Sequence, residues 1–432
     1  MMIYDEAMQM KEELVACRRD LHAHPELAWT EFRTASHVAK SLKALGYEVL
    51  MGDACMKADE MMGVPDKAEL SRAMGRAIKE GADPELVKKM EGGKTGVVGI
   101  MHFAKPGKTV GLRFDMDCLL VEENPTDAHR PTRDGFASTH PGLMHACGHD
   151  GHTAIGLGVA RLIAAHKDEM AGTVKLCFQP GEEGVMGARG MVASGIVDDV
   201  DYFLSGHIGL GNGENNSLVC MTEGFLATSK IDAFFTGKPA HAGANPQNGR
   251  NALLAAAQAS LALHTISRHS DGPSRINVGI LKAGTGRNVI PDNAVIKFET
   301  RGGSTAINEF MEGEARRMIK AAADMYGVTV KMVARGSAAS GNSSPDMGEE
   351  VYEVVKGLGV YSDIEKNHTV SGSEDCSYFM SRVQDHGGKA VYMLYGTEEA
   401  SGHHTSEFDF NEDVLPLSVY TVTELVKHFT NK

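Results

Sequence analysis

The segment His145-Ala-Cys-Gly-His-Asp-Gly-His152 places a thiol, three imidazoles and a carboxylate within eight residues, and a helical pattern follows it over residues 153–165. Strand-like runs stand on both sides, at 109–114 and 172–178. Histidine and cysteine are preferred ligands of borderline-soft metals, and such groups gain nothing from burial unless something coordinates them. The segment therefore predicts a metal site inside an α/β region. A histidine-rich loop without a metal is the alternative.

Strand and helix patterns alternate outward from this segment, which indicates an α/β core with a largely parallel sheet. The strands at 109–114, 172–178 and 202–207 each lead into polar residues. Because the carboxyl ends of parallel strands meet at one edge of a sheet, we expect these polar residues to converge. Asp115 and Asp117, which follow the first of these strands, are expected either to orient metal ligands or to cap a loop.

A different order of elements begins near residue 225. The expected elements are strand 229–236, helix 251–268, strand 275–283, strand 293–301, helix 304–326 and strand 328–335. This is the β-α-β-β-α-β order of a ferredoxin-like α+β domain. In the tail we expect strand 389–394, a loop that contains histidines, and a closing helix at 412–429. These elements indicate that the chain returns to the first domain.

The order of elements therefore predicts a discontinuous α/β catalytic domain that is interrupted by an inserted α+β domain. The catalytic domain is expected to comprise residues 1–224 and 336–432, and the inserted ferredoxin-like domain residues 225–335. Residues 52–93, rich in Met, Lys, Glu and Ala, are expected to form a helical insertion within the first part.

Composition excludes several classes of protein. The chain has 432 residues, 42% of them apolar and 23% charged, as is usual for soluble globular proteins. Its net charge of −14 argues against nucleic acid or an anionic membrane as partner. Seven scattered cysteines predict reduced thiols rather than a disulfide framework. Since the first residues lack the pattern of a signal peptide, we expect a cytoplasmic protein.

Adjacent acids at Glu182 and Glu183 follow the strand at 172–178, in the turn Pro180–Gly184. In a turn, one carboxylate can face a metal and the other a water activated by that metal. A water of this kind needs a nearby carboxylate to accept its proton and pass it to a leaving amine. An ordinary solvated acidic turn is the alternative.

The chain offers five metal ligands in all. They are Cys147, His149, Glu183, His207 and one of His403 and His404. Five ligands are too many for one open catalytic zinc with three protein ligands, and they suit two metals that share a bridge. A thiolate or a water is the candidate for that bridge.

Several motifs together resemble the dinuclear M20 amidohydrolases, a family that includes aminoacylases, hippurate hydrolases and auxin-conjugate hydrolases. Besides the first segment they are Phe178-Gln-Pro-Gly-Glu-Glu-Gly184, Gly206-His207, Ala240-His-Ala-Gly243 with Gly249-Arg-Asn-Ala-Leu253, and Gly372-Ser-Glu-Asp375. The resemblance runs nearly from end to end, and it implies a discontinuous α/β metallohydrolase catalytic domain with an inserted ferredoxin-like α+β lid or dimerisation domain. A narrower resemblance, to the branch that hydrolyses p-aminobenzoyl-glutamate, rests on the 52–93 insertion, Arg133–Ser138, Gly286–Pro291, Glu299–Gly302 and Gly402–His404.

The resemblance implies a role for each ligand. It implies that Cys147 bridges two divalent metal ions, that His149 and His207 bind one ion, and that Glu183 and His404 bind the other. His404 is preferred because the family's ligand histidine lies four residues before a phenylalanine, here Phe408. The resemblance favours manganese, whereas cysteine and histidine ligands suit zinc.

The resemblance also implies that Glu182 is the general base and acid, and that His241 and Asn288 of the inserted domain contact the substrate. Arg301 is implied to bind a substrate carboxylate. From the residues alone, Asn288 is equally a turn residue, and Arg301 is equally the partner of a neighbouring acid. Gly181 departs from the family, which usually has alanine there, and this puts the geometry of the turn in question.

The implied activity is cleavage of the amide of an N-aroyl or N-acyl amino acid, with p-aminobenzoyl-glutamate as the favoured substrate. The alternatives are a general N-acyl-amino-acid aminoacylase and a non-catalytic conjugate-binding partner subunit. The expected assembly is a homodimer, or a heterodimer with a related sister subunit. The resemblance implies that the site is completed across that dimer.

Overall fold

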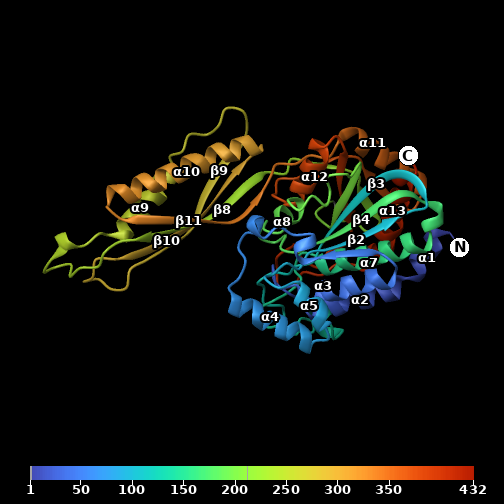
Figure 1. Cartoon of the computed structure of the whole chain (residues 1–432), viewed down its shortest axis with the longest axis horizontal. Coiled ribbons are helices and arrows are strands. Elements are labelled where there is room, and N and C mark those ends of the chain that lie inside the picture. Colours follow the sequence, from blue (N-terminus) through green and yellow to red (C-terminus); the bar gives the residue numbers. More distant parts are fainter. Residues whose placement is uncertain (1, 212) are drawn as a thin grey trace. The chain divides into compact units, whose positions relative to one another are not determined.

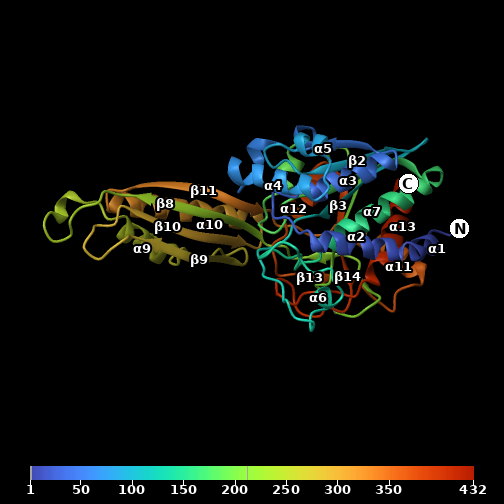
Figure 2. The ribbon, with the colours of Figure 1, turned by 90° about the horizontal axis from the view of Figure 1, so that it is seen from below.

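The computed structural model of the protein describes residues 2–211 and 213–432, which form two compact units. Unit 1 consists of Met1–Glu223, Asn342–Val370 and Asp375–Lys432, and unit 2 consists of Gly224–Gly341 and Ser371–Glu374. Unit 1 is thus built from separate stretches of sequence that unit 2 interrupts. Figures 1 and 2 show the elements of both units in two views.

Unit 1 is built on an eight-stranded sheet with the strand order β1-β2-β4-β3-β5-β14-β6-β12. Its strands are β1 Glu48–Met51, β2 Val97–His102, β3 Lys105–Asp115, β4 Ala171–Gln179, β5 Tyr202–Ile208, β6 Ser217–Val219, β12 Asp363–Glu365 and β14 Lys389–Gly396. The central strands β4, β3, β5 and β14 are parallel. Strands β1, β2 and β6 add antiparallel pairs, so the sheet is mixed with a parallel centre. Antiparallel strands commonly extend a parallel sheet in this way.

The helices of unit 1 pack on both faces of this sheet and on one another. They are α1 Ile3–Gln9, α2 Lys11–Ala23, α3 Phe32–Ala44, α4 Lys67–Lys79, α5 Pro84–Lys89, α6 Arg130–Arg133, α7 His149–Ala165, α8 Ala188–Val192, α11 Pro345–Leu358, α12 Cys376–Asp385 and α13 Val414–Thr430. On one face α7 packs so closely that a Cβ added at Gly156 would lie 2.7 Å from atoms of Phe114 and Phe178. On the other face Phe203 of β5 stacks on Phe379 of α12 with ring centroids 5.5 Å apart. Burial on both faces explains why the central strands are nearly continuous apolar runs in the sequence.

Unit 2 is a four-stranded antiparallel sheet with the strand order β11-β8-β10-β9. Its elements are β8 Ala227–Thr236, α9 Ala252–Leu263, β9 Ser274–Ala283, β10 Asn293–Gly302, α10 Thr305–Met325 and β11 Thr329–Ala338. The β-α-β-β-α-β order is the predicted one, and Figure 1 shows α10 lying along the strands. Ile276, Ile296 and Phe298 of the strands share a core with Ala256 of α9 and Met311 of α10. Both helices therefore pack on the same face of this sheet.

Several boundaries differ from the sequence-based expectation. The predicted helix at residues 5–24 is two helices, α1 and α2, that meet at Met10. The predicted helix at 251–268 ends at Leu263, although Ile266 continues the apolar spacing and is buried. Helices α11 and α12 lie in a stretch for which the sequence analysis predicts no element.

The insertion at residues 52–93 is tied to the rest of unit 1 by specific contacts. Asp83 caps α5 with its side chain, and its backbone N–H donates to Ser36 Oγ of α3 at 3.0 Å. The indole N–H of Trp29 donates to the carbonyl of Met62 at 2.8 Å. The insertion is therefore a packed part of unit 1.

Candidate metal centre

Three parallel strands of unit 1 end beside one another. β3 ends at Asp115, β4 ends at Gln179 just before the turn that carries Glu182, and β5 holds His207 next to its last residue. The register of β3 and β4 places Asp115 opposite Gln179. The carboxyl ends of the strands thus bring together segments that are far apart in sequence, which is the convergence that parallel strands predict.

Cys147 and His149 are positioned by the start of α7. Gly148 is the N-cap of this helix and has a φ of 90°, in the left-handed region where glycine is favoured. α7 begins at His149 rather than at residue 153, because the glycine makes the turn within the motif. Both flanking side chains are buried, and the positive end of the helix dipole favours a thiolate there.

The five predicted metal ligands lie in two groups that share Cys147. Ligand atoms of Cys147, His149 and His207 lie within 4.8 Å of one another, and so do those of Cys147, Glu183 and His404. Cys147 Sγ is 3.5 Å from His207 Nε2. His404 Nε2 is 3.6 Å from Glu183 Oε2. One thiol therefore belongs to both groups, as a bridging ligand would.

Glu182 stands next to these groups. One of its carboxylate oxygens is 4.0 Å from His149 Nε2, and Glu182, Glu183 and His149 form a further group within 4.8 Å. Of the two adjacent acids, Glu183 also joins the group that contains Cys147. The turn thus directs the two carboxylates differently, as is required if one faces a metal and the other faces the water activated by that metal.

The turn that carries Glu182 and Glu183 is held by two buried carboxylates from other segments. Asp117 accepts the backbone N–H groups of Glu182 and Glu183, each at 3.0 Å. Glu31 accepts the N–H of Gly181 at 2.9 Å. Gly181 has a φ of 63°, where a side chain would be strained. Glycine at this position therefore suits the turn rather than loosening it.

The histidines of the first segment are oriented by hydrogen bonds. His149 Nδ1 lies 2.9 Å from the backbone oxygen of Asp117, so its Nε2 faces the ligand groups. His152 Nδ1 lies 2.5 Å from Asp115, and its Nε2 accepts the N–H of Ile208 at 2.8 Å. Both nitrogens of His152 are thus engaged, and this residue links β3, α7 and β5.

The electrostatics of the site oppose negative charge on its ligands. Burial raises the pKa of the Cys147 thiol well above its usual range, and the carboxylates of Glu183 and Glu182 add to the shift. Burial also raises the pKa of Glu183 to about 7. Burial and the neighbouring imidazole of His152 lower the pKa of His207 well below its usual range, so His207 is neutral and able to coordinate. A bound cation would displace the protons from the thiol and the carboxyl group.

Two buried atoms show that a divalent metal fits this site. His149 Nε2 and Glu183 Oε1 have no hydrogen-bond partner within residues 2–211 and 213–432, and they lie 3.8 Å apart. Buried polar atoms without partners are costly, and a coordinated ion would satisfy both. Thiol, imidazole and carboxylate donors are the usual ligands of zinc, and imidazole and carboxylate also suit manganese.

Two adjacent histidines approach the site from the tail. His404 has a φ of 64°, a strained conformation for a residue other than glycine, and its N–H donates to the carbonyl of Ala146 at 2.8 Å. His403 Nδ1 lies 3.5 Å from Cys147 Sγ, and its Nε2 lies 3.0 Å from Glu399. Of the two, His404 joins a ligand group and is 56% exposed. His403 is thus a neighbour of the Cys147 thiol. The sequence spacing alone did not show which of the two histidines joins a ligand group.

Buried charges that support the site have no local sequence signal. Arg18 is fully buried, and its Nε donates to Asp150 at 2.8 Å across 132 residues of sequence. The same guanidinium pairs with Asp409 and Glu412 of the tail. Because Asp150 follows His149, this ion network anchors the start of α7.

His241 and Asn288, two of the predicted substrate residues, belong to adjoining loops of unit 2. The N–H of Ala242 donates to the backbone oxygen of Asn288 at 3.0 Å. His241 Nδ1 accepts the N–H groups of Gly243 and Ala244 at 3.1 and 3.0 Å. The neutral His241 ring therefore carries its proton on Nε2, which is an available donor.

Arg301, the third predicted substrate residue, lies on β10 of unit 2. Its guanidinium donates two hydrogen bonds to Glu299, at 2.9 and 3.3 Å. This is the pairing with a neighbouring acid that the residues alone suggest. Its role toward a substrate carboxylate stays a prediction.

The chain matches Peptidase family M20/M25/M40 over residues 111–428. The chain belongs to this family. The M20 enzyme is 48% identical over 422 residues to the indole-3-acetyl-aspartic acid hydrolase of Enterobacter agglomerans, covering 98% of this chain and 97% of that protein. It is 47% identical over 413 residues to a subunit of the p-aminobenzoyl-glutamate hydrolase of Escherichia coli, covering 95% and 94% of the two chains.

A solved structure agrees with this membership. The crystal structure of the aminobenzoyl-glutamate utilization protein from Klebsiella pneumoniae matches the M20 enzyme with a TM-score of 0.85 and 39% identity, over 99% of this chain and 98% of that one. The predicted resemblance and α/β fold class are confirmed. The protein is a hydrolase that acts on amide bonds.

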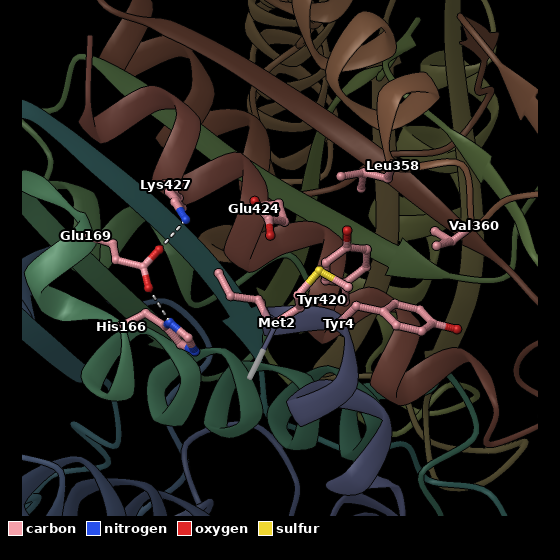
Figure 3. Close-up of a pocket in the computed structure, with 10 residues that line it drawn as sticks. Met2, Tyr4, His166, Glu169, Leu358, Val360, Tyr420, Glu424 and Lys427 are labelled. Carbon is pink, nitrogen blue, oxygen red and sulfur yellow. Dashed lines mark hydrogen bonds and ion pairs between the residues drawn. The ribbon is translucent and has the colours of Figure 1, made fainter.

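A pocket elsewhere in unit 1 contains none of the candidate ligands. It has a volume of about 600 Å³ and is lined by the N-terminal residues, the segment that follows α7, the end of α11, and α13, with Tyr4 and Tyr420 in its wall (Figure 3). Glu169 in this pocket pairs with His166 and Lys427, so the charge of this carboxylate is already matched. Every helix within the described ranges is too short or too polar to traverse a bilayer.

Proposed function

We propose that this M20 enzyme hydrolyses the amide bond of N-aroyl and N-acyl amino acids, with p-aminobenzoyl-glutamate as the favoured substrate. The observation that carries the proposal is the pair of ligand groups that share Cys147, with Glu182 beside them. The substrate assignment is supported by two relatives of 47–48% identity. One is an indole-3-acetyl-aspartic acid hydrolase, and the other belongs to a p-aminobenzoyl-glutamate hydrolase.

Two divalent metal ions per chain are part of this proposal, with manganese favoured and zinc as the alternative. We assign Cys147 as the bridge, His149 and His207 to one ion, and Glu183 and His404 to the other. When bound, such ions supply Lewis acidity, which makes water a nucleophile near neutral pH and polarises a carbonyl group.

The chain's own residues then carry the proton transfers. The Glu182 carboxylate accepts a proton from the attacking water, and the same carboxyl group donates it to the nitrogen of the leaving amine. Asp117 and Glu31 hold the turn that carries Glu182, so the carboxylate is positioned before substrate binds. Its side chain is 11% exposed, so little bulk water reaches the carboxylate.

The substrate contacts are assigned to unit 2. Because both backbone donors bind Nδ1 of His241, its Nε2–H is free to donate to the amide oxygen as negative charge develops there. Asn288, whose backbone holds the His241 loop, is assigned to a polar contact with the substrate. Arg301, fixed by Glu299, is assigned to a carboxylate of the substrate.

The proposed assembly is a homodimer or a heterodimer with a related sister chain. Unit 2 exposes large apolar side chains on helix α9 and edge strand β9, namely Leu254, Leu261, Ile280 and Leu281. An open edge strand beside exposed apolar side chains is suited to pairing with another chain. The Escherichia coli relative is itself named as one subunit of its hydrolase.

The test is to load the purified protein with manganese or with zinc and incubate it with a panel of conjugates, read by mass spectrometry. The panel contains p-aminobenzoyl-glutamate, indole-3-acetyl-aspartate, hippurate and N-acetyl amino acids. Preferential release of p-aminobenzoate supports the proposal. Equal cleavage of all N-acyl amino acids would instead identify a general aminoacylase, and binding without cleavage a non-catalytic partner.

A further inference from the structure

Unit 2 contains a pocket in which half of the lining residues are arginines. It has a volume of about 410 Å³ and is lined by Arg268, Arg275, Ile276, Asn277, Glu299 and Arg301. Arg268 precedes β9, and the other residues lie on β9 and β10. Three guanidinium groups therefore share one pocket in a chain whose net charge is −14.

The register of the strands explains why these side chains meet. Arg275 lies directly opposite Arg301, and Asn277 lies opposite Glu299, in the antiparallel pair of β9 and β10. Opposite residues of such a pair project from the same face. The alternate residues, such as Phe298, belong to the core beneath α9 and α10. The pocket is thus on the face of the sheet that the helices of unit 2 leave open.

The charges in this pocket are unbalanced. Like charges directly opposite each other in a sheet are destabilising, and Arg275 and Arg301 are such a pair. Glu299 neutralises Arg301 through two hydrogen bonds. Arg268 and Arg275 are exposed, and neither has an ion pair or side-chain hydrogen bond within the part of the chain that the structure describes. Lys230, opposite Glu299 on β8, adds to the positive charge.

We propose that Arg275, together with Arg268, binds the side-chain carboxylate of an acidic amino acid in the substrate, and so selects glutamate and aspartate conjugates over neutral ones. This inference rests on the proposed function, which supplies an N-acylated amino acid. A conjugate of glutamate or aspartate carries two carboxylates. Arg301 is assigned to one of them, which leaves the unpaired guanidinium groups of Arg275 and Arg268 for the other. Guanidinium binds carboxylate in a two-bond geometry that a lysine cannot reproduce.

The experiment compares p-aminobenzoyl-glutamate with p-aminobenzoyl-glutamine, which has the same shape and lacks the side-chain charge. kcat and KM are measured for the metal-loaded wild-type protein and for Arg275→Gln, Arg268→Gln and Arg275→Lys. Lys320→Gln is the matched control, because it removes one exposed positive charge from α10 of the same unit. Thermal unfolding verifies that each variant is folded.

We expect Arg275→Gln to raise KM for the glutamate conjugate by about tenfold or more, while kcat/KM for the glutamine conjugate stays at the wild-type value. Arg268→Gln should act in the same direction, Arg275→Lys should recover part of the preference, and Lys320→Gln should leave it unchanged.

Two results would overturn the inference, and they are distinguishable. If the wild-type protein cleaves both conjugates and Arg275→Gln raises KM equally for both, the pocket does not bind the side-chain carboxylate. The proposed function still stands in that case. If the wild-type protein cleaves neither conjugate, the proposed function fails and the inference fails with it.

Discussion

The carboxylate of Asp117 connects the fold to the chemistry of the candidate metal centre, and Asp117→Asn tests that connection. In the wild-type protein its two oxygens accept the N–H groups of Glu182 and Glu183 at 3.0 Å. Asparagine replaces one oxygen with a donor, so one N–H of the buried turn loses its acceptor. The unsatisfied N–H is expected to cost about 1–3 kcal/mol of folding stability. The bond from His149 to the backbone oxygen of Asp117 is retained, but the substitution also changes the contact of 3.3 Å between Asp117 Oδ1 and His149 Nδ1.

Because the turn carries both a ligand and the proposed base, we expect metal affinity or kcat/KM to fall by about 10–100-fold in Asp117→Asn. Metal affinity is measured by competition with a chromophoric chelator, and kcat/KM with p-aminobenzoyl-glutamate. Asp168→Asn, at an exposed position, is the control. If Asp117→Asn unfolds at a lower temperature but matches Asp168→Asn in metal affinity and activity, the carboxylate stabilises the fold without positioning the site.

Three further predictions concern the ligands, the assembly and acid stability. Cys147→Ala should bind less metal than the wild-type protein, and retention of two ions per chain by mass spectrometry would show that the thiol is no ligand. Mixing inactive Glu182→Gln and His241→Ala chains under exchange conditions should restore about a quarter of wild-type activity if the site is completed across a dimer. No recovery, with mixed dimers verified by native mass spectrometry, would rule out that arrangement. Burial alone would raise the pKa of Asp409, but the hydrogen bond from Arg130 and the positive charges of Arg18 and Arg130 together outweigh it and lower the pKa. The folded state then binds fewer protons, so this stabilisation is complete above the ordinary pKa of about 4 and is lost as the pH falls through the folded value. The stability difference between the wild-type protein and Asp409→Asn should therefore shrink in acid, and a constant difference in denaturant titrations would contradict this.

The parts of the fold that depend on repeating patterns were predictable from the sequence. The β-α-β-β-α-β order of unit 2 follows from alternating strand residues and from helices that begin at side-chain caps such as Asn251 and Ser304. The convergence of Cys147, Glu183 and His207 follows from parallel strands that end at one edge.

The parts that depend on contacts between distant segments were not predictable. Arg18 contacts Asp150 and Glu412 only in the folded chain, because these residues are far from it in sequence. From the sequence, a lone arginine in an amphipathic helix is expected to be exposed. Glu31 likewise gives no local sign that it will accept the N–H of Gly181. The basic pocket of unit 2 also required the strand register, because Arg275 and Arg301 are far apart in sequence and become neighbours only across β9 and β10.

The most direct test of the central claim is Glu182→Gln, measured for both metal content and hydrolysis. The substitution removes the proton acceptor and leaves all five proposed ligands in place. We predict that the variant retains two metal ions per chain by mass spectrometry and cleaves p-aminobenzoyl-glutamate at least about 100-fold more slowly than the wild-type protein. Cleavage near the wild-type rate by the metal-loaded variant would contradict the account.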